Sequence, residues 1–354
     1  MKNYFAVKFW YEFYYSIFGT LLKTTMNKFV PLLLLFSGCV FSQSDSLSIH
    51  NKRFENRKTQ TYTIDANTER IYYQPKWHEP VTNLWQDFKD TNRDFIADDH
   101  AWYLGGALAA TAVMIPFDQD IIDESRRFAD KMGLSPDNKY GSLGPLSNIP
   151  QNTGAAFYLV GNGTTVLLLS AGFMTHALFT NDYRAYATAS GMLESMALSG
   201  FYIQVLKRTT GRESPFIARE NGNPGGDWNP FPSFTAYGEN TPTYDAFPSG
   251  HLATIMSAFT VITTNYPEVK WLKPVGYSAI GLLSFQMVQS EVHWISDYPL
   301  ALIIGYFSGK NIARNRFIDR KKDGQVNLKK KYDLRVTGNY HRYGFQTLGL
   351  KMTF

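Results

Sequence analysis

Six stretches of apolar and small residues, each as long as a helix, dominate the chain between residues 101 and 309. They span residues 101–117, 154–179, 185–206, 251–266, 274–290 and 298–309. Runs of this length, rich in Gly and Ala, are typical of helices that pack closely against one another. An amphipathic stretch at 118–133 predicts one more helix between the first two runs. We therefore expect a mainly α fold, a compact six-helix bundle.

The remaining segments differ from the bundle in composition. Residues 43–95 are polar and without a sustained apolar period, which predicts an extended segment with only local structure. The helical domain is then expected at 96–312, and a basic linker with C-terminal strands at 313–354. Apolar residues alternate with polar ones toward Phe354, which indicates a short β hairpin.

The N-terminal 42 residues resemble a leader followed by a secretory signal. A charged Lys28 precedes an apolar run from Phe29 to Phe36, and small residues follow up to Ser42. Cleavage after Ser42, lipidation of Cys39 as the first mature residue, and an uncleaved anchor are all compatible with this stretch. Each alternative predicts a protein of the cell envelope. Because Cys39 is the only cysteine, an internal disulfide and a cysteine-based zinc site are excluded.

Two alternatives remain for the bundle's surroundings. Only the run at 154–179 comfortably reaches the roughly 20 apolar residues of a membrane span. A membrane-embedded bundle and a soluble or peripheral one therefore both stay open, and membrane association is expected. The net charge of +5 comes from residues 310–335, where ten Lys and Arg face three Asp and Glu. We interpret that segment as a headgroup-facing or cytoplasmic flank, or as a solvated tail, and expect no nucleic-acid partner.

Three polar clusters interrupt the apolar runs. The first, LKRTTGRESP, ends the third run and supplies Lys207 and Arg212. The second, PSGH, starts the fourth run, where Ser249 can cap a helix whose free N–H groups suit an anion. The third, VHWISDYP, spaces His293 and Asp297 four residues apart, so that on a helix the carboxylate can orient the imidazole. Each cluster alone also has an ordinary structural explanation, as a cap, a packing residue or a surface pair.

Together, the order and spacing of these clusters resemble the superfamily of type 2 phosphatidic acid phosphatases and vanadium-dependent haloperoxidases. Its signature reads K-x6-R-P, then PSGH, then S-R-x5-H-x3-D. The resemblance covers residues 97–312 and implies a helical bundle that works without metal or cofactor. It implies that His293 is the nucleophile, Asp297 orients it, and His251 protonates the leaving oxygen. Phosphate oxygens would be bound by Lys207, Ser249 and Gly250.

The sequence departs from this signature at both arginines. Ser214 stands where the first is expected, and Gln286-Met287 replace the Ser-Arg pair. Phosphoryl transfer relies on positive charge around the phosphate oxygens, so their absence matters. We expect Arg212, two residues before Ser214, to compensate by binding phosphate.

Two functions compete from here. The first is a metal-independent phosphatase that acts on a lipid phosphate or on a polyprenyl or lipid pyrophosphate. It would work through a phosphohistidine intermediate in the membrane or periplasm of the cell envelope. The alternative is an impaired pseudo-enzyme or envelope protein that binds an anionic headgroup. A vanadate haloperoxidase is the weakest reading, because vanadate binding in that branch relies on the missing arginines.

Overall fold

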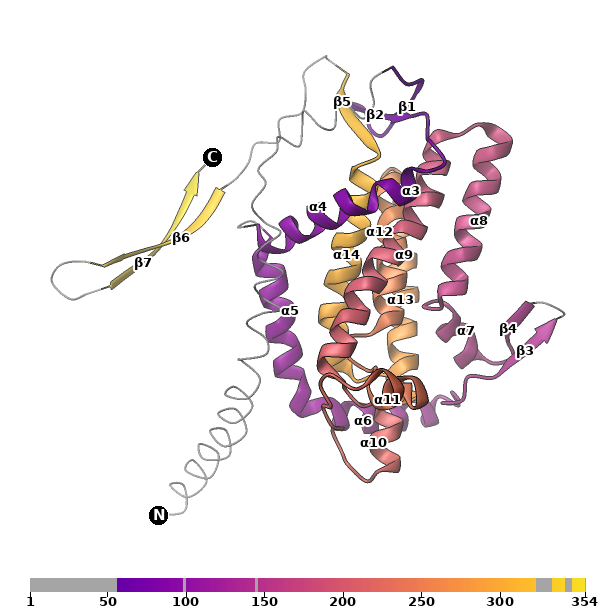
Figure 1. Cartoon of the computed structure of the whole chain (residues 1–354), viewed down its shortest axis with the longest axis vertical. Helices are drawn as coiled ribbons and strands as arrows, with labels where there is room; N and C mark the ends of the chain where they lie inside the picture. The colour runs from indigo at the N-terminus through magenta and orange to yellow at the C-terminus, as the bar shows by residue number, and fades with distance from the viewer. Residues whose placement is uncertain (1–55, 98–99, 144–145, 323–332, 341–345, 354) are drawn as a thin grey trace. The chain divides into compact units, whose positions relative to one another are not determined.

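The computed structural model describes residues 56–97, 100–143, 146–322, 333–340 and 346–353, and these belong to the unit Phe54–Phe354. The predicted leader and signal, with Cys39 and Ser42, lie outside the described residues. The six apolar runs all form helices. These are α5 (Ala101–Met114), α8 (Gly163–Thr180), α9 (Tyr183–Thr210), α12 (Gly250–Asn265), α13 (Leu272–Gln289) and α14 (Tyr298–Arg314). The mainly α fold is confirmed (Figure 1).

The described helices are not limited to those six. The amphipathic stretch forms α6 (Asp118–Lys131), which packs on α13, and α4 (Leu84–Ile96) packs on α14. The expected six-helix count is therefore too simple as a description of the bundle. The shorter elements are α3 (Glu79–Thr82), α7 (Thr153–Leu159), α10 (Pro215–Glu220), α11 (Phe234–Glu239), the 3-10 turns η1 (Ile115–Phe117), η2 (Thr241–Thr243) and η3 (Ile295–Asp297), and the hairpin β3 (Tyr140–Leu143) with β4 (Leu146–Pro150).

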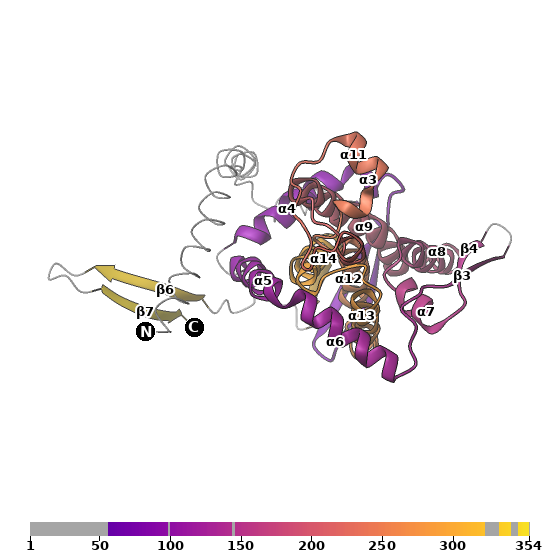
Figure 2. The ribbon, with the colours of Figure 1, turned by 90° about the horizontal axis from the view of Figure 1, so that it is seen from below.

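The helix α12 lies at the centre of the bundle, packed against both α9 and α14. Figure 2, which looks along the helices, shows α5, α6, α13, α7 and α8 arranged around this centre. Contact between α12 and α14 is close because Gly305 and Gly309 face α12: an added Cβ would lie 2.6 Å from the Ala253 carbonyl oxygen and 2.2 Å from that of Ser257. No larger residue fits there. The first two turns of α12, which begins with the PSGH motif, are thus packed closely against α14.

The second apolar run breaks into two helices instead of forming one. The chain leaves α7 after Leu159 and begins α8 at Gly163, with the Asn162 side chain accepting a hydrogen bond from the Thr164 N–H as the helix cap. At the break, a Cβ on Gly161 would lie 3.0 Å from the His251 Cβ. The break therefore brings this loop against the first turn of α12.

The segment before the bundle is more ordered than its polarity predicts. Two strands, β1 (Thr59–Thr63) and β2 (Thr68–Tyr73), form an antiparallel sheet with β5 (Phe317–Lys321), which follows α14. Arg70 binds Asp319 through two hydrogen bonds of 2.6 and 2.9 Å. Within the predicted extended segment 43–95, residues 59–95 thus form β1, β2, α3 and most of α4, and β2 pairs with a strand more than 240 residues away in sequence.

The C-terminal alternation forms the predicted hairpin. β6 (Asp333–Tyr340) pairs antiparallel with β7 (Gln346–Thr353) in an unbroken register from Asp333–Thr353 to Tyr340–Gln346. The hairpin expected from the alternating pattern is confirmed.

The surface of the bundle carries many exposed apolar side chains. On α8 alone, Leu168, Leu178 and Phe179 are 60%, 71% and 87% exposed. Within the part of the chain that the structure describes, α8 is the one helix long and apolar enough to cross a membrane, and only 17% of it is buried. This is weak evidence of membrane association.

Candidate functional site

The three polar clusters meet at the end of the bundle where α9 ends and α12 and α14 begin. The Ser249 N–H donates to the Asp297 carbonyl at 3.1 Å, which joins the second cluster to the third. The Ala246 N–H donates to the Arg212 carbonyl at 2.9 Å, which joins the segment before PSGH to the first. Residues separated by up to 90 positions in sequence therefore share one site, as their order predicts.

His293 lies in the turn between α13 and α14, buried, with its imidazole held by Asp297. The His293 Nδ1 lies 3.3 Å from Asp297 Oδ2, which also accepts the Trp294 N–H at 2.9 Å. A carboxylate on Nδ1 favours the tautomer that protonates Nδ1 and leaves Nε2 with a free lone pair. The pair is thus arranged as an oriented nucleophile requires, although the residues lie in a turn and η3 rather than on one regular helix.

His251 occupies the first turn of α12, and its ring centroid lies 5.9 Å from that of His293. On another side it packs against Tyr158 of α7, with the ring centroids 4.6 Å apart. Burial, and after it the nearby His293 and Lys207, lower the pKa of His251 to about 3. Without an anion beside it, His251 is therefore neutral at ordinary pH.

The start of α12 has the features expected of an anion-binding helix terminus. Ser249 is fully buried and caps the helix by accepting the Leu252 N–H at 3.4 Å. A Cβ on Gly250 would lie 3.7 Å from Lys207 Nζ, so the lysine head reaches this terminus. That lysine is not free, because its Nζ lies 3.2 Å from Asp245 Oδ2.

Arg212 lies beside these residues, but its terminal nitrogens contact carboxylates and a hydroxyl. Its Nη1 donates to Asp297 Oδ1 and to Ser296 Oγ, both at 2.6 Å, and its Nη2 donates to Asp118 Oδ2 at 2.6 Å. The side chain is fully buried, with the rings of Trp228 and Trp294 at 4.7 and 5.2 Å. Phosphate binding by Arg212 stays a prediction, and these contacts favour a different role for it.

The two positions of the missing arginines hold neutral, buried side chains. Met287 is fully buried in the apolar core, and Ser214 precedes α10 as its N-cap. Gln286 donates to Asn138 Oδ1 at 3.0 Å and accepts from Gln289 at 2.7 Å, so its amide is already hydrogen-bonded. None of these three side chains brings positive charge to the site.

Sequence reasoning missed Tyr158, Asp118, Ser296 and Asp245, which all contact predicted site residues. Ser296 was the easiest of the four to predict from the sequence, since it directly precedes Asp297. Asp118 and Tyr158 lie in segments without a polar motif, and only the tertiary fold brings them to the site. Among the residues that the structure describes, no group of three or more His, Cys, Asp or Glu is placed to hold a metal ion.

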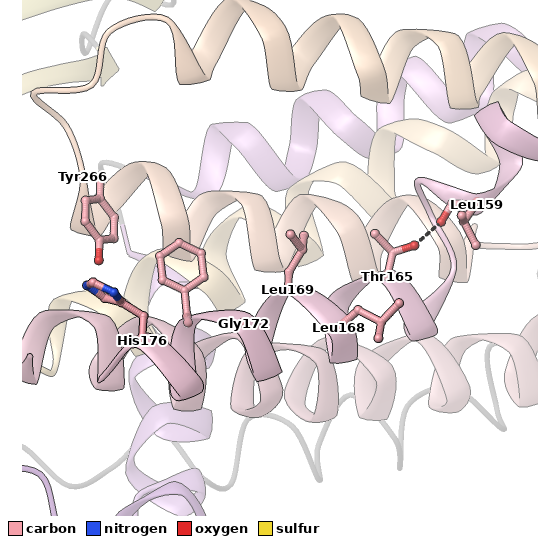
Figure 3. A pocket seen from close by; sticks show the side chains of 8 residues that line it. Leu159, Thr165, Leu168, Leu169, Gly172, His176 and Tyr266 are labelled. Carbon is pink, nitrogen blue, oxygen red and sulfur yellow. Dashed lines mark hydrogen bonds between the residues drawn. The ribbon is translucent and has the colours of Figure 1, made fainter. Parts of the chain in front are cut away.

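An apolar groove runs along α8. It has a volume of about 650 Å³ and is lined by Leu159, Thr165, Leu168, Leu169, Gly172, Phe173, His176 and Tyr266. Figure 3 shows Leu159 and Thr165 at one end and His176 and Tyr266 at the other. Leu159 directly follows Tyr158, whose ring packs on His251. The groove residue Leu159 thus adjoins in sequence a residue that contacts His251.

Comparison with known families agrees with this geometry. Residues 188–319 match the family model of the PAP2 superfamily, which confirms the resemblance to type 2 phosphatidic acid phosphatases for that segment. The match contains all three polar clusters and supports phosphatase-type activity on phosphorylated substrates. No curated protein and no solved structure matches the chain.

Proposed function

We propose that this protein is a metal-independent phosphatase of the cell envelope that acts on a lipid phosphate or a polyprenyl or lipid pyrophosphate. The observation that carries the proposal is the histidine pair: His293, held by Asp297, has its ring 5.9 Å from that of His251 at the start of α12. Such a pair offers a nucleophile and an acid on either side of a phosphoryl group.

In the proposed first step, Nε2 of His293 attacks phosphorus while the bond from phosphorus to the leaving oxygen breaks. The positive charge that develops on the His293 ring is stabilised by Asp297 through the Nδ1–H. His251 gives its proton to the leaving oxygen. In the second step, His251 takes a proton from water, whose oxygen attacks the phosphohistidine and releases inorganic phosphate with His293 regenerated.

His251 must be protonated to act as the acid, yet its pKa is lowered to about 3 in the free site. A bound phosphate brings negative charge next to the ring, and an opposite charge favours the protonated form. We therefore propose that substrate binding itself raises the pKa of His251. The acid would be formed only when a phosphate group is present.

Phosphate oxygens would be bound by Lys207, the Ser249 hydroxyl and the Gly250 N–H. Support comes from the capped helix start and from the lysine head beside Gly250. Because both signature arginines are absent, this cradle holds less positive charge than the superfamily signature implies, and we expect weaker phosphate binding for that reason.

The groove along α8 supports an apolar substrate tail. From Thr165 to His176 it follows twelve residues of helix, whose eleven steps of the usual rise span about 16 Å. An acyl or isoprenoid chain lying there would place its head group next to Tyr158 and the histidine pair. The exposed apolar surface of α8 supports membrane association as the route by which such a substrate arrives.

The test is phosphate release by purified full-length protein in the presence of EDTA. Phosphatidic acid, undecaprenyl pyrophosphate and a soluble aryl phosphate are compared, with His293→Ala beside the wild type and the exposed His78→Ala as the control. We expect release by the wild type and by His78→Ala, and none by His293→Ala. Equal release by His293→Ala would contradict the proposed nucleophile.

One observation favours the second candidate, a pseudo-enzyme that binds an anionic headgroup. The missing arginines are replaced by neutral side chains, and Lys207 is already paired with Asp245. A site with this charge can bind an anion without stabilising its transition state. Absence of release from all three substrates, together with phosphate binding that depends on Lys207, would support this function instead.

A further inference from the structure

A fully buried polar cluster lies behind the candidate catalytic pair and has no part in the mechanism above. Its members are Asp118, Arg212 and Ser296, and each is 0% exposed. Asp118 starts α6, whereas Arg212 follows α9 and Ser296 lies in η3. Burial of a carboxylate and a guanidinium is energetically unfavourable unless the two groups pair closely, so the cluster requires an explanation.

The cluster is joined to Asp297 through a single guanidinium. Asp297 uses its two oxygens differently: Oδ2 faces His293 and the Trp294 N–H, whereas Oδ1 accepts from Arg212 at 2.6 Å. A carboxylate bound at both oxygens is restricted in rotation about its last torsion. Arg212 therefore fixes the direction in which Asp297 presents Oδ2 to His293.

Asp118 in turn fixes Arg212. It accepts the guanidinium at 2.6 Å and the Ser296 hydroxyl at 2.5 Å on Oδ2, and the Ser296 N–H at 3.0 Å on Oδ1. Burial raises the pKa of Asp118, while the guanidinium and the Ser296 donors oppose that rise. These three contacts of the Asp118 oxygens are all with hydrogen-bond donors, which suits a carboxylate rather than a carboxylic acid.

The charges of this chain of contacts also bear on the chemistry. With Asp118 and Asp297 ionised and Arg212 protonated, the buried set carries one net negative charge. An imidazole that becomes cationic beside it is stabilised, and this is the charge that His293 develops as phosphohistidine forms. Arg212 with a single carboxylate would instead be neutral overall and would give no such assistance.

We propose that Asp118 is a positioning residue, which acts through Arg212 to hold Asp297 and so keeps His293 in its nucleophilic tautomer and orientation. The inference rests on the proposed function for its consequence in catalysis. It also assigns Arg212 to the support of Asp297 rather than to the phosphate oxygens, which accounts for its complete burial and its contacts with two carboxylates.

The test compares Asp118→Asn, which keeps the side-chain shape, with Asp120→Asn, an exposed carboxylate in the same first turn of α6. We expect Asp118→Asn to lower kcat by between about 10- and 100-fold with little change in KM. In an Asp297→Asn background the same change is expected to have little further effect, because Asp118 acts through Asp297. An equal loss of kcat in the wild-type and Asp297→Asn backgrounds would contradict the proposal that Asp118 acts through Asp297.

A second arm does not depend on turnover. Nitrogen NMR of histidine-labelled protein, at alkaline pH, reports which ring nitrogen of His293 carries the proton. We expect the Nδ1–H tautomer in the wild type and a mixture of tautomers in Asp118→Asn. A wild-type tautomer and a wild-type kcat in Asp118→Asn would reduce Asp118 to a structural residue. Ser296→Ala, which removes only the bridging hydroxyl, provides the same two readouts if Asp118→Asn folds poorly.

The two proposals fail separately. If the wild type releases no phosphate from any substrate, the proposed function fails, and the tautomer still decides whether Asp118 positions His293. If the wild type is active and His293→Ala is not, the proposed function stands. Unchanged kinetics and an unchanged His293 tautomer in Asp118→Asn would then overturn only the positioning role of Asp118.

Discussion

At the residue scale, the lysine of the phosphate cradle is the side chain whose pairing most limits anion binding. Lys207 Nζ lies 3.2 Å from Asp245 Oδ2, and the Asp245 side chain is partly exposed. A phosphate group must compete with this carboxylate for the lysine, and it is also repelled by the same negative charge. Because the two arginines of the signature are absent, the signature lysine is left as a partly neutralised cation beside the start of α12.

Removing the competing carboxylate should therefore strengthen anion binding. For Asp245→Asn we expect the inhibition constant of inorganic phosphate to fall about fivefold, which corresponds to roughly 1 kcal/mol for a partly exposed pair. Lys207→Met should raise the inhibition constant of phosphate, because it removes the cation. The constant is measured by inhibition of aryl phosphate hydrolysis, or by calorimetry if the protein proves inactive. Glu239→Gln, an exposed carboxylate on α11, is the control and should leave the constant unchanged; weaker phosphate binding by Asp245→Asn would contradict the argument.

His251 makes the stability of the fold depend on pH. Its pKa is lowered to about 3, first by burial and then by His293 and Lys207, whereas an unfolded histidine titrates near 6.5. Between these values the unfolded chain binds a proton that the native site refuses, so acidification favours unfolding. The native state should lose the stability that His251 contributes as the pH falls from about 6.5 towards 3. Above about pH 6.5, His251 should not make the stability depend on pH.

His251→Gln should remove this component of the acid sensitivity. We expect the drop in Tm between neutral pH and about pH 4.5 to be smaller in His251→Gln than in the wild type, as measured by scanning calorimetry or fluorescence in matched buffers. The exposed His78→Gln should retain the wild-type slope. Parallel slopes for all three proteins would show that His251 is not held neutral in the native state.

At the element scale, apolar pattern and length were sufficient to locate α5, α9, α12, α13 and α14 to within a few residues. The apolar pattern did not predict the break between α7 and α8, since the residues on both sides are apolar and the cap at Asn162 is a local signal of the break. It also failed for β1 and β2, whose stability depends on β5. The structure therefore departs from expectation where a distant partner or a single cap decides the local conformation.

The groove on α8 allows a test at this scale with little risk to the fold. Gly172 lines the groove, and a Cβ there would meet nothing within 4 Å, as is also true of Gly281 on α13, outside the groove. Gly172→Trp should fill the groove, while the change away from glycine favours the helix by up to about 1 kcal/mol. We expect a higher KM for a long-chain lipid phosphate and an unchanged KM for a soluble aryl phosphate.

Gly281→Trp is the matched control, because it adds the same side chain to an exposed helix position away from the groove. It should leave both KM values as in the wild type. An equal rise of KM for both substrates in Gly172→Trp would indicate a general disturbance of the site, and no rise for the lipid would mean that the chain binds elsewhere.

At the scale of the whole molecule, the order of the polar clusters was enough to predict that His251, His293 and Asp297 meet. That prediction rests on the resemblance of the three clusters to the superfamily signature, since each cluster alone has an ordinary structural explanation. The chain of contacts from Asp118 through Arg212 to Asp297 was not predictable in the same way. Asp118 precedes Arg212 by 94 residues and lies in a stretch that reads as an ordinary amphipathic helix start. Charges buried by long-range pairing have no signature in one sequence.

The apolar exterior of the bundle predicts how the whole protein partitions. Leu178 is 71% exposed on α8, which contains no Asp, Glu, Lys or Arg, and Leu167 is 48% exposed on the same helix. Large exposed apolar surfaces mark interaction with a membrane or another protein, and a charged side chain at such a position is unfavourable in lipid by about 2–3 kcal/mol.

We expect the wild type to remain in the membrane fraction after a high-salt wash and to be extracted by detergent. The Leu167→Glu, Leu178→Glu double variant should shift toward the soluble fraction and bind liposomes less in flotation assays, with its Tm little changed because neither side chain is buried. Val81→Glu, at an exposed apolar position of α3, is the control for added negative charge. Release of the wild type by salt alone would instead mean that the basic segment, and not the apolar face of α8, holds the protein to the membrane.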